Sequence, residues 1–176
     1  MTVSPTDSAV FTALRSFLTT YLPSGVAVVR AQVNRVPEPI GTDFVVMTPV
    51  MRERLETNIV TYNDPYPSTP STRTDMVPTR VTIQLDVHGP NSADNAALIT
   101  TLWFSDVTCQ AMAASGIAPL FAETPRQLAF LNAERQYEDR WSLDLTLQAN
   151  IAITTAQQFA GVVTPNIIEV DTTYRP

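Results

Sequence analysis

The feature that most constrains the fold is a strict alternation of apolar and polar side chains over residues 141–153. Every odd position is apolar, and the even positions are polar apart from Ala152. A period of two residues is typical of a β-strand with one buried and one solvated face. Such a strand would reach about 43 Å at roughly 3.3 Å per residue, whereas a typical strand has about five or six residues. We therefore expect a sheet that runs the length of the domain or projects beyond it, and a projecting strand would serve assembly.

Two helices are predicted from spacing and capping. The first begins with Ser4 as N-cap and Pro5 at the first helical position, and it ends before residues 23–25. The second is a long helix that begins at Asn91 or Ser92, continues to about residue 115 and ends at Gly116. Strands are expected at residues 26–33, 44–48, 57–62 and 79–87, with a solvated charged link at 51–56.

These elements predict an α+β fold. We expect a mainly antiparallel twisted sheet with long strands, on which one long helix and one N-terminal helix pack. The length of 176 residues and an apolar fraction of 44% favour a single domain spanning residues 1–176. Residues 1–10 have no basic region and no apolar run, so we expect no signal peptide. No stretch approaches the roughly 20 apolar residues that cross a membrane.

Two segments fit no regular element. Residues 63–78 contain four prolines and few apolar side chains, which predicts an extended loop that is neither a helix nor a central strand. The loop is either a simple connection or a contact arm that becomes ordered on a partner. Residues 155–176 are predicted to form a C-terminal tail that could add an edge strand to this subunit or to a neighbour.

The charge composition bears on function. The formal net charge is −6, and all eleven basic residues are arginines. Arginine forms bidentate pairs with carboxylates, which suits fixed contacts between subunits, although drift in base composition explains the lack of lysine equally well. A negative net charge argues against binding nucleic acid by phosphate neutralisation. It is compatible with a surface past which DNA slides.

Little in the sequence indicates chemistry. His88 and Asp86 would share one strand face and could form a general base, but we interpret His88 as a surface or turn residue. Cys109 is interpreted as an inert core residue of the long helix. Acidic residues near position 138 alternate with arginines, which favours salt bridges over acid–base catalysis. The sequence has no phosphate-binding glycine loop, nucleophile elbow or zinc spacing. We therefore predict no catalytic residue, no metal site and no cofactor.

Three motifs in a fixed order resemble the neck and tail-terminator proteins of tailed bacteriophages. A strand ends in D-V-H-G-P at residues 86–90, a helix begins with A-D-N-A at residues 93–96, and E-D-R-W at residues 138–141 leads into the long strand. The resemblance covers roughly residues 57–154. It implies a homo-oligomeric ring, commonly a hexamer, at the head–tail junction of the virion. Such a ring caps the tail tube and joins it to the connector around the DNA channel, without catalytic residues.

The resemblance implies as partners further copies of the chain, the tail tube protein and the head–tail connector or adaptor. DNA would pass through without specific binding, no membrane would be involved, and assembly would take place in the host bacterial cytoplasm. We expect neighbouring subunits to contact one another through the long sheet and through Arg–carboxylate pairs. The candidate interface residues are Asp64, Tyr66, Arg73, Asp75, Arg135, Glu138 and Arg140.

Three alternatives stay open at the level of sequence. The nearest is a connector or tail-completion protein of different symmetry. A soluble small-molecule binding module is an alternative of another class, and a deep apolar pocket would favour it. An enzyme is the third, and it would need a site around His88 that the sequence does not reveal.

Overall fold

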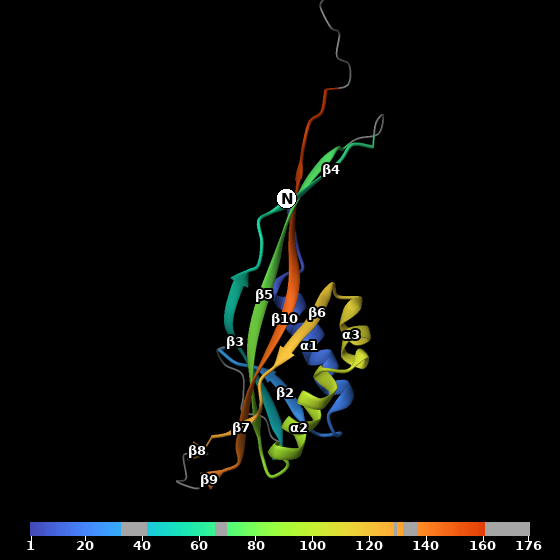
Figure 1. Cartoon of the computed structure of the whole chain (residues 1–176). Helices are drawn as coiled ribbons and strands as arrows, with labels where there is room; N and C mark the ends of the chain where they lie inside the picture. Colours follow the sequence, from blue (N-terminus) through green and yellow to red (C-terminus); the bar gives the residue numbers. More distant parts are fainter. Residues whose placement is uncertain (33–41, 66–69, 129, 132–136, 161–176) are drawn as a thin grey trace, which may run out of the picture.

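Two strands of equal length form the centre of the fold. The computed structural model describes residues 1–32, 42–65, 70–128, 130–131 and 137–160. Within them, β5 (Thr72–His88) and β10 (Arg140–Ala156) have 17 residues each and pair antiparallel from one end to the other. At roughly 3.3 Å per residue each strand spans about 56 Å. The predicted long strand is confirmed and has a partner of the same length (Figure 1).

Shorter strands line both sides of this pair. Along β5 lie first β3 (Phe44–Arg54) and then β4 (Ile59–Asn63). Along β10 lie β7 (Arg126–Gln127), β6 (Ile117–Ala122) and β1 (Thr2–Ser4). Outside β3, β2 (Ala27–Arg30) pairs in parallel, so the sheet is mixed, although its other described strand pairs are antiparallel as predicted. Strands β8 (Phe130–Leu131) and β9 (Tyr137–Glu138) form a separate two-stranded ladder.

Three helices pack on one face of the sheet (Figure 1): α1 (Asp7–Tyr21), α2 (Ser92–Trp103) and α3 (Asp106–Ala113). The alternation in β5 and β10 explains this layering, because the side chains at the odd positions of residues 81–87 and 143–149 all point to the helices. The α+β layering with a sheet-dominated core is therefore as predicted. The core combines apolar residues of the two long strands (Val81, Ile83, Leu85, Val87, Leu143, Leu145, Leu147) with those of the helices (Val10, Leu14, Phe17, Leu18, Ile99, Trp103, Met112).

The first helix begins later than predicted. Thr6 is the N-cap, and its Oγ1 accepts a hydrogen bond from the backbone N–H of Ala9 at 3.2 Å. Ser4 lies instead in β1, where it pairs with Ala152 of β10. The capping signal at Ser4 is overridden because pairing with the edge of β10 holds residues 2–4 extended, and only the sheet provides that partner.

The prediction of one long helix over residues 91–115 is wrong, because the segment forms two helices that meet at Phe104 and Ser105. Ser105 is extended, with φ −95° and ψ 159°, and it is the N-cap of α3. The hydroxyls of Ser105 and Thr108 each donate to the carbonyl oxygen of Leu102 at 2.6 Å. These two hydrogen bonds satisfy a carbonyl oxygen at the C-terminal end of α2. They also compete with the backbone hydrogen bonds that would continue the helix. Ser105 and Asp106 therefore start a new helix, although the apolar spacing on either side of them suggests one continuous helix.

The predicted loop over residues 63–78 is also too long, because residues 72–78 belong to β5. Pro78 has no N–H, yet it lies in a central strand. Its carbonyl accepts from the N–H of Leu55 at 2.9 Å, so the missing donor faces the side of β3 and β4. On that side β3 ends at Arg54 and β4 begins at Ile59. Pro78 is tolerated because the donor it lacks falls in this gap between the two partners.

The other predicted strands are present with different bounds. The strand expected at 26–33 is the shorter β2, after which Gln32 takes a positive φ of 61°. The strand expected at 44–48 is the longer β3, which includes residues 51–54 of the predicted solvated link. The side chains of residues 51–54 are nevertheless exposed, as expected. The strand expected at 57–62 is β4.

Candidate assembly surface

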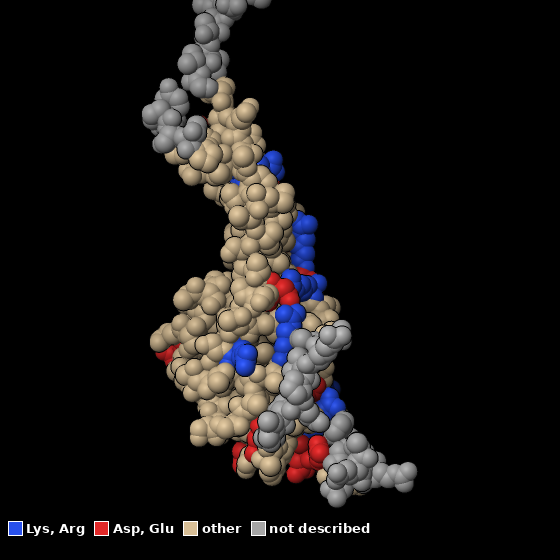
Figure 2. All heavy atoms as spheres, turned by 180° about the vertical axis from the view of Figure 1, so that it is seen from behind, with Lys and Arg blue, Asp and Glu red and all other residues tan. Residues whose placement is uncertain are grey.

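The sheet projects past the helices as an arm. We define the arm as β4, residues 72–78 of β5 and residues 150–156 of β10, which are paired with one another. Figure 1 shows the helices beside the other halves of β5 and β10, so no described helix covers either face of the arm. In the space-filling view of Figure 2 the arm is the narrow upper part of the molecule, and most of its visible surface is uncharged. The long strands therefore exceed what the core of the subunit needs.

One face of the arm is largely apolar, and no described element covers it. Strand register places Val60, Asp75, Ile153 and Val3 in one row across four strands. Val60 is 39% exposed and Ile153 is 36% exposed. The odd positions of β5 and β10 that form this face are those that meet the helices farther down the strands. The core-facing side of the sheet thus continues beyond the core without a covering layer from the described residues, which is typical of a surface that binds another protein.

Two of the predicted interface residues form a bidentate ion pair on this face. Arg73 donates from Nε to Asp75 Oδ2 at 2.9 Å and from Nη2 to Asp75 Oδ1 at 2.8 Å. The hydrogen bond to Arg73 lowers the pKa of the Asp75 carboxyl. The guanidinium also lies over the ring of Tyr62, 5.9 Å from its centroid, and Tyr62 is 56% exposed. The arm therefore presents a fixed ion pair among exposed apolar side chains.

The remaining predicted interface residues do not form one patch. Asp64 lies beyond β4, where it accepts a hydrogen bond from Ser71 Oγ at 2.6 Å. Glu138 is an exposed residue of β9, and Arg140 begins β10, so both lie at the opposite end from the arm. Tyr66 and Arg135 lie outside the described residues, as do residues 66–69 of the predicted loop and 161–176 of the predicted tail. The candidate residues thus separate into an arm group and a group at the far end.

The described Arg–carboxylate pairs lie within one chain. Arg140 pairs with Asp86 at 2.8 Å, and both Arg30 and Arg52 pair with Asp7 at the start of α1. Arg80 pairs with Glu53 between β5 and β3. These described pairs link neighbouring elements of one subunit. A role for arginine between copies therefore stays a prediction.

The interpretation of His88 as a surface or turn residue is wrong. His88 is the last residue of β5 and is only 8% exposed. Its ring stacks on Phe44 with centroids 4.5 Å apart and an angle of 7° between the planes. Strand register places Phe44 directly opposite His88, and the sequence could not reveal this pairing. Because Asp86 is engaged by Arg140, the structure does not support a general base formed by Asp86 and His88.

The interpretation of Cys109 as a buried core residue is also wrong, because the cysteine is exposed. The break at Ser105 changes the phase of the helical stripe. In α3 the residues that face the core are Thr108 and Met112. Cys109 would share a buried face with Leu98 only if one continuous helix ran through both residues.

A metal site and a membrane-spanning helix find no support in the part of the chain that the structure describes. No group of three or more His, Cys, Asp or Glu side chains there could hold a metal ion. None of the described helices is both long and apolar enough to cross a membrane. The arm is therefore the surface feature that the fold itself leaves unexplained.

Comparison with known proteins agrees with this geometry. A family model described as phage neck terminator protein matches residues 8–174. The chain belongs to the phage neck terminator family. The match extends well beyond residues 57–154, over which the motifs showed a resemblance, and that resemblance is confirmed. Membership gives the chain a structural role in terminating the phage tail at the neck. No curated protein matches the sequence.

A solved structure has the same fold as this neck terminator. It is the sheath/tube terminator, in the extended state, of the extracellular contractile injection system PVC, determined by cryo-electron microscopy. The sequences are 14% identical and the TM-score is 0.54. The match covers 97% of the present chain but 65% of the other chain, so the neck terminator spans about two thirds of that protein's length. At this identity the likeness shows the fold alone.

Proposed function

We propose that this neck terminator forms a homo-oligomeric ring, most simply a hexamer, at the head–tail junction of the virion. The observation that carries the proposal is the arm, where the core-facing side of β5 and β10 continues uncovered past the helices. A monomer gains nothing from extending both strands together, whereas a neighbouring copy could cover the exposed row through Val60 and Ile153. A closed ring requires a head-to-tail contact, in which the arm of one copy meets a different surface of the next.

The ring would cap the tail tube and join it to the head–tail connector around the DNA channel. The family membership and the fold of a sheath/tube terminator support the capping role. The net charge of −6 suits a channel through which DNA passes without being bound. The tail tube protein and the connector are the expected partners, assembly takes place in the host cytoplasm, and no catalytic step is part of this function.

The proposal is tested by the mass and shape of the purified full-length protein, alone and mixed with tail tube. Native mass spectrometry and negative-stain microscopy should show a six-fold ring, formed alone or on the tube end. A strictly monomeric protein in the presence of tube would overturn the ring. A closed ring of another symmetry would overturn the hexamer.

A further inference from the structure

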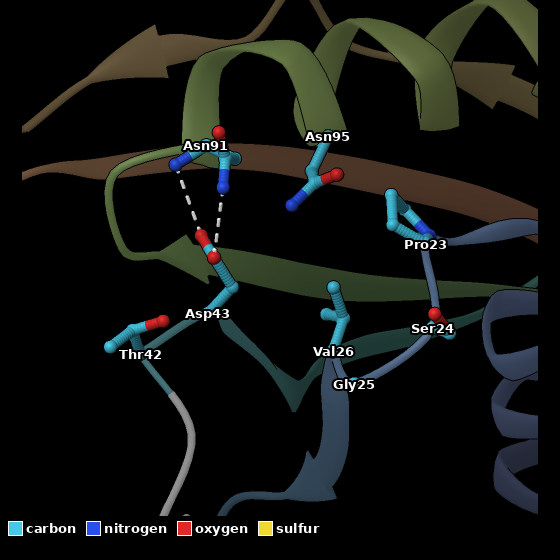
Figure 3. Close-up of a pocket in the computed structure, with 8 residues that line it drawn as sticks. All are labelled: Pro23, Ser24, Gly25, Val26, Thr42, Asp43, Asn91 and Asn95. Atoms are coloured by element: carbon cyan, nitrogen blue, oxygen red, sulfur yellow. Dashed lines mark hydrogen bonds between the residues drawn. The ribbon is translucent and has the colours of Figure 1, made fainter.

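The end of the subunit opposite the arm contains a polar pocket of about 270 Å³. Three segments line it: the turn after α1 with Pro23 and Val26, residues 42–43 before β3, and the start of α2. Figure 3 shows these segments converging from different parts of the chain. A pocket of this size accommodates one side chain or one short piece of backbone from another molecule. The proposed ring does not require it.

Asp43 forms a fixed wall of the pocket. Its Oδ1 accepts a hydrogen bond from the backbone N–H of Asn91 and its Oδ2 accepts one from Asn91 Nδ2, both at 3.0 Å. A carboxylate has about four acceptor positions, so each oxygen can accept one more hydrogen bond. The carboxylate is thus held in place by Asn91 and remains able to accept from a ligand.

Asn95 offers the pocket a hydrogen-bond donor, whereas Asp43 offers acceptors. This residue is only 2% exposed, and its Nδ2 makes no hydrogen bond to any described residue. In Figure 3 the Asn95 amide nitrogen points into the space between Asp43 and Val26. A buried donor without an acceptor is destabilising. An acceptor bound in the pocket would satisfy this donor.

The ligand must therefore accept a hydrogen bond from Asn95 and donate one to Asp43, beside the apolar ring of Pro23 and the methyls of Val26. An amide group has a carbonyl acceptor and an N–H donor within one plane. A carboxylate would be repelled by Asp43, and a guanidinium has no acceptor for Asn95 Nδ2. We propose that this pocket binds an amide group presented by a loop of a partner polypeptide, from either a main-chain peptide or an Asn or Gln side chain.

The test uses the uniformly ¹⁵N-labelled full chain and follows the side-chain NH₂ signal of Asn95 during titration with small amides. Acetamide represents the side-chain source and N-methylacetamide the main-chain source. We expect saturable shifts of the Asn95 signal with a dissociation constant in the millimolar range, as for ligands of so few atoms. The tighter of the two probes identifies the source. Absence of a saturable shift with both probes would overturn the proposal.

Two comparisons decide whether the binding has the proposed chemistry. Asn95→Leu should weaken the binding at least tenfold, judged from the backbone signals of Gly25 and Asp43, whereas the control Asn63→Leu on the arm should leave it unchanged. Acetate and guanidinium should each bind at least tenfold more weakly than the better amide. Equal binding by Asn95→Leu, or by either ion, would contradict the assignment. If Asn95→Leu does not fold, the ion comparison on the wild-type chain decides.

Discussion

Arg140, the first residue of β10, binds Asp86 near the end of β5 through two nitrogens of its guanidinium. Nη2 lies 2.8 Å and Nε lies 3.1 Å from Asp86 Oδ1, and the side chain of Asp86 is 10% exposed. The pair joins the two long strands at the end where β10 begins. It therefore holds in register the strands on which the arm is built.

Removing the carboxylate of this pair should lower stability. We expect Asp86→Ala to reduce the free energy of unfolding by about 2 kcal/mol, because it removes the carboxylate that the partly buried Arg140 guanidinium binds through two nitrogens. Urea unfolding followed by circular dichroism measures the change. Glu123→Ala is the matched control, since its pair with Arg126 is exposed and should contribute at most about 0.5 kcal/mol. Equal losses in both variants would show that burial of the Asp86 pair has no energetic consequence.

Asp144 on β10 should make the protein less stable as the pH rises. Its pKa is raised, first by partial burial and then by the negative charge of Glu123, with Asp86 adding to the effect and Arg126 opposing it. The folded state therefore holds the proton more tightly than the unfolded chain, and stability falls as pH rises from about 3.8 through the raised pKa. We expect Asp144→Asn to melt at a higher temperature than wild type at pH 7, with the difference vanishing near pH 3.

Asp75→Asn should change the melting temperature with the opposite sign and is the control for Asp144→Asn. Arg73 lowers the pKa of Asp75, so this carboxylate stabilises the folded state above its ordinary pKa and the contribution is lost as pH falls. Asp75→Asn should therefore melt below wild type at pH 7 and together with it at strongly acidic pH. Parallel melting curves of both variants and wild type across the series would refute the two assignments.

Gly89 lies where β5 turns toward α2, and it should not tolerate a side chain. Its φ is +104°, and a Cβ there would overlap the carbonyl oxygen of Thr42 and lie 2.6 Å from Asp43 Oδ1. We expect Gly89→Ala to reduce the free energy of unfolding by about 3 kcal/mol. Gly25 has a similar φ of +98°, but no atom lies within 4 Å of the position that a Cβ would take. Gly25→Ala should reduce stability by only about 1 kcal/mol of backbone strain, and similar losses would exclude the close contact as the cause.

Cys109 should react readily with a thiol reagent in the folded protein. The side chain is exposed because α3 is a separate helix with Thr108 and Met112 on its buried side. We expect the rate of modification of the native protein by a chromogenic disulfide to lie within about tenfold of the rate in denaturant. Protection by several orders of magnitude would favour one continuous helix with Cys109 in the core.

Charge on the apolar face of the arm should prevent assembly without unfolding the subunit. Val60→Arg places a cation opposite Asp75, and because Val60 is 39% exposed the stability should change by less than about 0.5 kcal/mol. We expect loss of the ring in native mass spectrometry and an unchanged circular dichroism spectrum. Thr61→Arg, on the other face of the same strand, is the control that should still assemble. Intact rings in Val60→Arg would remove this face from the interface.

Local patterns determined much of this protein. The alternation in residues 141–153 specified the long strand β10, and that in residues 79–87 specified the part of β5 that faces the helices, because side-chain period and burial are coupled within a single strand. The spacing of Val10, Leu14 and Phe17 specified the buried face of α1 for the same reason. The three ordered motifs indicated the phage neck terminator family, which the match over residues 8–174 confirms.

The tertiary structure alone decided what depends on distant partners. Pro78 lies in a central strand because β3 ends and β4 begins beside it. His88 is buried because Phe44, far away in the sequence, pairs with it. The arm exists because the helices are shorter than the strands they cover, and Asn95 faces a pocket because three separate segments meet there. A periodic pattern shows which side of a helix or strand will be buried. Only the tertiary structure shows how far along the element other parts of the chain bury that side.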